Sequence, residues 1–170
     1  MVVVARRMGS RHKPKVVVSR CLGFEACRWN AEIICSQTVD ELRDNIEFVT
    51  VCPEQDIGLG VPRKPIDLVL VDDMVRVIQK ETGRDVTDEL RGFSEAFLEG
   101  VGTVDGFILK SRSPSCGRGT TRIREGSGVK IGSGVFASCA EKRYPDRVIL
   151  DEEELEEMGS DAFLRLVASP

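Results

Sequence analysis

The chain has 170 residues, of which 41% are hydrophobic and 31% are charged, and its formal net charge at pH 7 is −4. This size suits one globular domain that buries about 70% of its unfolded surface, and the acidic balance provides no overall basic footprint for nucleic acid. No stretch approaches the ~20 apolar residues of a membrane span, and six cysteines without a credible signal peptide argue against a secreted disulfide scaffold. We expect a cytoplasmic protein with a basic, flexible leader at residues 1–14 and one domain at residues 15–170.

The first half of the chain predicts a β-strand, a helix and a second strand. Lys15–Ser19 is a short apolar run of β-branched residues, which is typical of a buried strand. A helix is expected from Ser36 to Asn45, because SQTVDEL begins with a good N-cap residue. Glu47–Val51 is the next apolar strand. A strand, a helix and a strand in this order indicate a parallel βαβ unit.

The middle of the chain predicts a hairpin and then a long helix. Asp67–Gln79 contains two alternating runs divided at Asp72 and Asp73, which is the pattern of a small β-hairpin. Apolar residues spaced three and four apart between Thr87 and about Gly100 indicate a helix with one buried face. We interpret the hairpin as an excursion from the main sheet.

The last third continues the alternation of strands and helices. Gly106–Lys110 and Val148–Leu150 are expected as the third and fourth strands, with a helix at Val135–Arg143 between them and an amphipathic C-terminal helix from Asp151 onward. The glycine-rich segment 117–135 is interpreted as a flexible lid or as the start of a helix that binds an anion. The series predicts one three-layer α/β domain, Rossmann- or flavodoxin-like, with a mainly parallel sheet.

Three turn-rich segments with cysteines follow predicted strands directly. They carry Cys21 and Cys27 (CLGFEACRWN), Cys52 (VCPEQDIGLG) and Cys116 (KSRSPSCGRG). Because the carboxyl ends of parallel strands meet at one edge, Cys21, Cys52 and Cys116 are expected to share a cleft. The alternative is separate buried thiols, since free cysteine is often buried. That alternative suits Cys35 and Cys139, which we expect in the core or in a helix.

A cluster of thiols favours a metal or an iron–sulfur centre. A structural zinc site would normally show two close cysteine pairs, and the sequence has no C-x₂-C pair. Iron–sulfur clusters accept thiolates scattered over several loops. Three ligands would leave one iron open for catalysis, whereas a fourth ligand, for which Cys27 is the candidate, would close the centre.

The motifs SRCLGFEACRWN, VCPE, GRDVTDEL and ILKSRSPSCG, in this order, resemble the thiouracil desulfidase family, which was formerly a domain of unknown function. The resemblance extends from about Lys15 to Leu150. It implies a [4Fe-4S] cluster held by Cys21, Cys52 and Cys116, whose unique iron accepts sulfur from a thiocarbonyl. The implied reaction is non-redox hydrolysis of a thiolated pyrimidine: thiouracil, thiouridine or its monophosphate.

Such a reaction needs a base for water and a proton donor, and we assign these catalytic roles to Glu54 and Ser111. Each has an alternative: Glu54 as an N-cap or turn acceptor, and Ser111 as a hydroxyl that bonds the backbone at the end of a strand.

Substrate binding is assigned to Ser113, Ser115 and Gly117, whose hydroxyls and N–H groups suit pyrimidine carbonyls or a phosphate, and to Arg28 as the cation for that phosphate. Arg112 is a second candidate, and solvated surface arginines are the alternative.

A second function from another class is a non-catalytic carrier or sensor of a metal or Fe–S cluster, with Cys27 as its fourth ligand. The expected partner is a small thiolated nucleobase, nucleoside or nucleotide, with thiolated tRNA less favoured. A homo-oligomer is compatible with the sequence.

Overall fold

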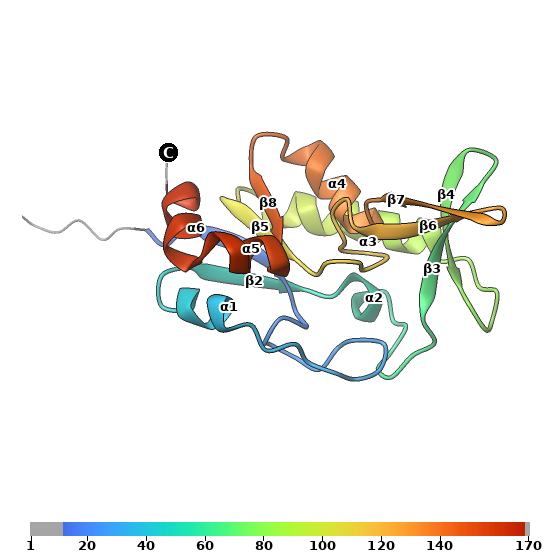
Figure 1. Cartoon of the computed structure of the whole chain (residues 1–170), viewed down its shortest axis with the longest axis horizontal. Coiled ribbons are helices and arrows are strands. Elements are labelled where there is room, and N and C mark those ends of the chain that lie inside the picture. Colours follow the sequence, from blue (N-terminus) through green and yellow to red (C-terminus); the bar gives the residue numbers. More distant parts are fainter. Residues whose placement is uncertain (1–11, 169–170) are drawn as a thin grey trace, which may run out of the picture.

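The computed structural model describes residues 12–168, and its centre is a four-stranded parallel sheet, sheet A (Figure 1). The strand order is β2-β1-β5-β8, and every neighbouring pair is parallel. The strands are β1 (Lys15–Ser19), β2 (Glu47–Val51), β5 (Gly106–Leu109) and β8 (Val148–Asp151). The parallel sheet confirms the predicted fold class, and the predicted βαβ unit is present as β1-α1-β2.

Helices cover both faces of sheet A and make three layers. The helices α1 (Gln37–Leu42), α5 (Glu152–Met158) and α6 (Ser160–Val167) pack on one face, and α3 (Thr87–Val101) and α4 (Val135–Arg143) pack on the other. Successive side chains of a strand point to opposite faces, so Val16 and Val18 join the first layer while Val17 joins the second.

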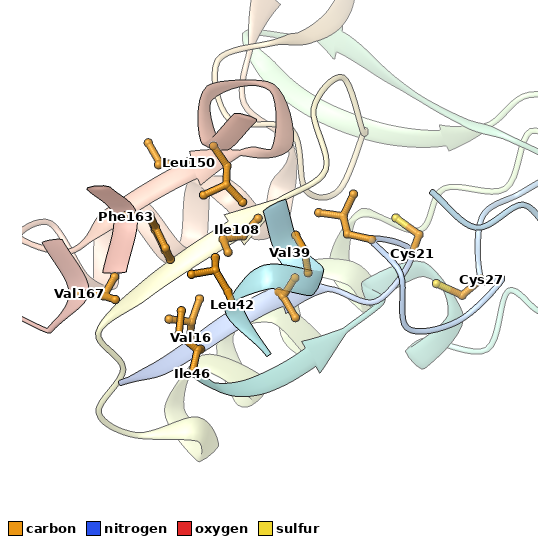
Figure 2. Packing of buried hydrophobic residues seen from close by; sticks show 13 residues of the cluster. Val16, Cys21, Cys27, Val39, Leu42, Ile46, Ile108, Leu150, Phe163 and Val167 are labelled. Carbon is orange, nitrogen blue, oxygen red and sulfur yellow. The ribbon is translucent and has the colours of Figure 1, made fainter. Parts of the chain in front are cut away.

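The layer on the α1 side is a continuous apolar cluster (Figure 2). Val39 and Leu42 of α1 and Phe163 and Val167 of α6 surround Ile108 of β5, and each is buried. Cys21 and Cys27 lie at one end of this cluster, on the loop that leaves β1 (Figure 2). The apolar layer therefore anchors the loop that carries the first two candidate ligands.

A second four-stranded sheet, sheet B, extends from one end of the domain, away from α5 and α6 (Figure 1). Its order is β4-β3-β6-β7, with β3 and β6 parallel and the outer pairs antiparallel. The strands are β3 (Ile66–Val71), β4 (Met74–Gln79), β6 (Thr121–Glu125) and β7 (Gly128–Gly132). The predicted hairpin is confirmed as β3-β4.

The interpretation of segment 117–135 was wrong. A flexible lid was one reading, but residues 121–132 form the β6-β7 hairpin of sheet B. The other reading was an anion at the start of α4. Instead, the first N–H groups of α4, at Val135, Phe136 and Ala137, donate to the carbonyls of Pro114 and Ser115. The start of α4 therefore holds the loop of Cys116 rather than an external anion.

Other boundaries differ from the predictions for local reasons. The C-terminal helix is broken at Gly159, whose φ of 83° ends α5, and α6 begins at the next residue. The helix expected over Ser36–Asn45 is shorter: Ser36 is its N-cap as predicted, but it ends at Leu42. Cys139 lies in α4 as expected, whereas Cys35 is exposed and precedes α1, so its expected place in the core or a helix was wrong.

Two further observations concern the ends of the chain and its hydropathy. Most of the leader proposed for residues 1–14, namely residues 1–11, lies outside the described residues, so the division into leader and domain stays a prediction. Among residues 12–168, none of the helices combines the length and the apolar character needed to cross a bilayer.

Candidate functional site

The three cysteine segments meet at the carboxyl ends of β1, β2 and β5, where they line one pocket of about 370 Å³. The lining residues include Cys21, Cys27, Cys52 and Cys116, and also Arg28, Glu54, Ser111, Ser113 and Ser115. The loops converge because β1 lies between β2 and β5 in a parallel sheet, so all three strands end on the same edge. Every assigned site residue except Gly117 therefore lies on one cavity.

Three of the four cysteines of the pocket are buried, and Cys52 is partly exposed. Cys27 and Cys116 are 1% and 4% exposed, and Cys21 is also buried. The Cys27 thiol interacts with the thiols of both Cys21 and Cys52. In addition, the Cys52 thiol donates to the carbonyl of Cys27 over 3.6 Å. Cys27 therefore lies in contact with two of the three expected ligands.

Their protonation follows from this environment. The hydrogen bond with Cys21 is the main cause that raises the pKa of Cys27 to about 11, and burial raises the pKa of Cys116 to about 12. For Cys52, the hydrogen bond with Cys27 and then burial raise the pKa. A thiolate here needs a cationic partner, and bound iron supplies one, since metal ligation deprotonates a thiol.

Two observations bear on the kind of metal group that the side chains of the pocket suit. Soft sulfur donors that come from separate loops and are mostly buried at one cavity suit an iron–sulfur cluster. Within residues 12–168, no set of three or more histidine, cysteine, aspartate or glutamate side chains is arranged to hold a single metal ion.

Glu54 is placed at the pocket by the short helix α2 (Pro53–Asp56), which begins directly after Cys52. Its carboxylate is buried, and both oxygens have protein donors. Oε1 accepts from the Ser115 hydroxyl at 3.0 Å, and Oε2 accepts from Nε and Nη2 of Arg63, each at 2.9 Å. The side chain of Glu54 is thus fixed by two loops and is not spent on capping α2 or closing a turn.

Arg63 is the pocket residue that sequence reasoning missed. Its side chain is 4% exposed, and besides binding Glu54 its Nη1 donates to the carbonyls of Cys27 and Gly60 at 2.8 and 3.0 Å. The sequence offered only a faint signal, an arginine after the Gly- and Pro-rich GLGVP. Arg63 joins the proposed base to the loop of Cys27.

Ser111 lies in a buried charged network at the end of β5. Its backbone N–H and its hydroxyl donate to the two carboxylate oxygens of Glu152, each at 2.7 Å. Lys110 Nζ donates to the Ser111 hydroxyl at 2.9 Å and forms an ion pair with Glu152. Burial alone would raise the pKa of Glu152, but hydrogen bonds from Lys110 and Ser111 outweigh it and hold that pKa below its ordinary value.

The loop of Cys116 uses two of the proposed binding groups for its own structure. The Ser113 hydroxyl accepts from the N–H of Cys116 at 3.0 Å, and the Ser115 hydroxyl donates to Glu54. Gly117 does not line the pocket. A Cβ there would lie 2.1 Å from Thr121 Oγ1 and 2.8 Å from the Ser113 carbonyl, so Gly117 allows close packing of the loop.

The proposed phosphate-binding arginines each have a carboxylate partner. Arg28 contacts Glu32 at 2.8 Å, and Arg112 contacts Glu153 at 2.5 Å. Both pairs are partly exposed, so each arginine can leave its carboxylate for another anion at a small cost in free energy.

The fold and the pocket together define a parallel α/β protein with a thiol-lined cleft and a buried carboxylate at the carboxyl edge of its sheet. The chain belongs to the 2-thiouracil desulfurase family, whose model matches residues 16–153. It is 32% identical over 148 residues to the uncharacterized protein YbbK of Bacillus subtilis, covering 81% of this chain and 96% of YbbK.

A solved structure is also similar. The [4Fe-4S]-dependent thiouracil desulfidase TudS has 29% sequence identity and a TM-score of 0.65, and the match covers 85% of this chain and 95% of TudS. The resemblance inferred from the cysteine motifs is thereby confirmed.

Proposed function

We propose that this protein hydrolyses the thiocarbonyl of a thiolated pyrimidine, namely thiouracil, thiouridine or its monophosphate. The C=S bond is replaced by C=O, water supplies the oxygen and both hydrogens, and sulfide leaves as H₂S without net oxidation or reduction. Family membership and the likeness to TudS support the desulfidase activity. The observation that carries the proposal is the meeting of three cysteine loops with the buried carboxylate of Glu54 in one pocket.

The proposed cofactor is the [4Fe-4S] cluster named for TudS, and Cys21, Cys52 and Cys116 would hold it here, one from each strand end. Three protein ligands would leave one iron without a protein ligand, and that iron would supply a thiophilic Lewis acid for the sulfur of C=S. Cys27 is the possible fourth ligand, because its thiol is in contact with Cys21 and Cys52.

Glu54 is proposed as the general base. Oε2 is occupied by two donors of Arg63, whereas Oε1 accepts only the Ser115 hydroxyl and keeps a lone pair. Oε1 is therefore the atom that would take a proton from water as its oxygen bonds to the carbon. Arg63 holds the carboxylate in place for that transfer through its two contacts with Oε2.

Ser111 is proposed as the proton donor to the departing group. Its hydroxyl accepts from Lys110 Nζ at 2.9 Å, so a proton lost from Ser111 can be replaced from the ammonium group. In the structure the hydroxyl proton is donated to Glu152 at 2.7 Å, so that hydrogen bond breaks when the proton passes to the departing sulfur. Ser113, Ser115 and Arg28 are proposed to contact the substrate, while Gly117 would act only by shaping the loop.

The second candidate is a non-catalytic carrier or sensor that holds a cluster through four cysteines. The contacts of Cys27 with Cys21 and Cys52 are the observation in its favour. A closed centre would leave no iron for a thiocarbonyl, so this candidate predicts a bound cluster and no turnover.

The test is anaerobic reconstitution with iron and sulfide, followed by addition of a thiouracil without a reductant. We expect uracil and sulfide in equal amounts over many turnovers. A cluster-loaded protein that releases no sulfide would support the carrier instead.

The size of the substrate is tested with the same preparation. A small thiopyrimidine should be turned over with little salt dependence, whereas a polynucleotide held by several phosphates would show a steep one. Activity on thiolated tRNA alone would reject the small-molecule proposal.

A further inference from the structure

Trp29 is a large aromatic side chain left exposed at the pocket. It is the only tryptophan in the chain, it is 47% exposed, and it is the one aromatic residue among those that line the pocket. Within residues 12–168, ring contacts join other aromatic residues, such as Phe24 with Phe48 and Phe107 with Tyr144, and Trp29 takes part in none of them. An indole has much apolar surface to bury, and here about half of it faces solvent and the pocket.

The backbone around Trp29 is held in place. The Trp29 carbonyl accepts from the backbone N–H of Arg63 at 2.9 Å, and the Cys27 carbonyl accepts from the guanidinium of the same arginine at 2.8 Å. Trp29 itself lies in a turn, which is closed by the N–H of Ala31 donating to the Arg28 carbonyl at 2.9 Å. The exposed indole thus stands on an ordered loop and requires little reorganisation to receive a ligand.

The same arginine connects Trp29 to the chemistry. The side chain of Arg63 that holds the Cys27 carbonyl also binds Glu54 Oε2, and its backbone N–H holds Trp29. Arg63 therefore holds the backbone of Cys27 and Trp29 and the proposed base together at one pocket of about 370 Å³, which has room for a pyrimidine ring.

Charge does not distinguish one neutral thiocarbonyl compound from another in this pocket. Among the lining residues that the structure describes, each basic side chain already contacts a carboxylate: Arg20 with Asp56, Arg28 with Glu32, Arg63 with Glu54, Lys110 with Glu152 and Arg112 with Glu153. Selection among neutral thiocarbonyl compounds then depends on hydrogen bonds, on shape and on ring contacts.

We propose that Trp29 stacks on the pyrimidine ring of the ligand and makes the site specific for flat heteroaromatic rings over non-aromatic thiocarbonyl compounds such as thioamides and thioureas. This inference rests on the proposed function and names the residue that selects its substrate class. A tryptophan can stack on any pyrimidine base, because every base presents a π-face. Loss of such stacking weakens binding by about tenfold or more.

The test uses the emission of this single tryptophan in the anaerobically reconstituted protein. Uracil, the unthiolated product, is titrated against 5,6-dihydrouracil, which keeps both carbonyls and both N–H groups but lacks the flat aromatic ring. We expect saturable quenching by uracil and binding of dihydrouracil that is weaker by about tenfold. Equal binding of the two compounds would overturn the proposal.

Two variants complete the test, with uracil binding measured by equilibrium dialysis. Trp29→Phe should bind within a few-fold of the natural protein, whereas Trp29→Ala should lose about tenfold and bind uracil and dihydrouracil equally, with unchanged iron content. Natural affinity in Trp29→Ala would contradict the stacking role. If the natural protein releases sulfide and Trp29→Ala binds uracil with natural affinity, this inference is wrong and the proposed function stands. If uracil binding depends on Trp29 but no sulfide is released, the proposed function is wrong and the stacking role stands.

Discussion

Arg63 holds Glu54 through one carboxylate oxygen: its Nε and Nη2 each lie 2.9 Å from Oε2, and both side chains are almost fully buried. This contact leaves Oε1 as the oxygen open to a reacting water. It also links the loop after β2 to the carbonyl of Cys27. The arginine is therefore a positioning residue for the proposed base.

The first prediction concerns this pair. Glu54→Gln keeps the shape of the side chain but loses its basicity, so kcat should fall about 10²-fold while iron content and uracil binding persist. Arg63→Lys keeps a charge but loses the forked geometry and should lower kcat less. Because the residues act as one unit, the double variant should be hardly slower than Glu54→Gln. Single-turnover sulfide release measures all three, and undiminished turnover in Glu54→Gln would remove it from the mechanism.

The second prediction concerns the proton donor. Ser111→Ala should retain its iron and lower kcat less than Glu54→Gln does, because a bound water can take the place of the hydroxyl. Lys110 and Glu152 should remain paired in that variant, while the loss of the buried hydrogen bond to Glu152 should lower the free energy of unfolding by about 1–3 kcal/mol. Both quantities are measured on one preparation by sulfide release and urea unfolding. A larger loss of rate than in Glu54→Gln would make Ser111 the more important group.

The third prediction separates a base-binding role from a phosphate-binding role for Arg28. If Arg28 leaves Glu32 to bind a phosphate, Arg28→Ala should raise KM for thiouridine monophosphate and leave KM for thiouracil unchanged. Glu32→Ala is the matched control, since it frees the arginine and should lower KM for the monophosphate. Equal effects of Arg28→Ala on both substrates would indicate that Arg28 shapes the loop and does not bind phosphate.

The fourth prediction concerns the packing of the Cys116 loop. A methyl group in Gly117→Ala would meet Thr121 Oγ1 at 2.1 Å, so this variant should lose about 1–3 kcal/mol of unfolding free energy and retain less iron. In Gly92→Ala, on an exposed part of α3, the new Cβ meets nothing within 4 Å, and the variant should gain roughly 0.5–1 kcal/mol. Urea unfolding compares them, and equal stabilities would contradict the packing role.

The strands and the meeting of the cysteine loops could be predicted from sequence because they depend on local patterns and one rule of topology. Apolar runs such as Lys15–Ser19 and Glu47–Val51 are strands as expected, and parallel strands end at one edge. Cys21, Cys52 and Cys116 therefore reach the same pocket from loops 95 residues apart.

Contacts between distant loops could not be predicted in this way. The pairing of Arg63 with Glu54 and of Lys110 with Glu152 depends on how loops pack after the sheet has formed. The β6-β7 hairpin was missed because the many glycines of this segment are typical of a loop. Thr121 and Ile123 nevertheless alternate with arginines, and a two-residue turn at Gly126 and Ser127 follows. That alternation is the signal that identifies the hairpin.

The fifth prediction tests the central claim, that the three cysteine loops hold the cluster on which desulfuration depends. Iron per chain and sulfide released from thiouracil are measured in the same anaerobic sample for the single variants Cys21→Ala, Cys52→Ala and Cys116→Ala, with Cys35→Ala and Cys139→Ala as controls. Each of the first three should lose both iron and turnover, while both controls keep about four iron atoms per chain and full turnover. Full iron retention in any of the three, together with loss of iron in Cys27→Ala, would contradict the ligand set.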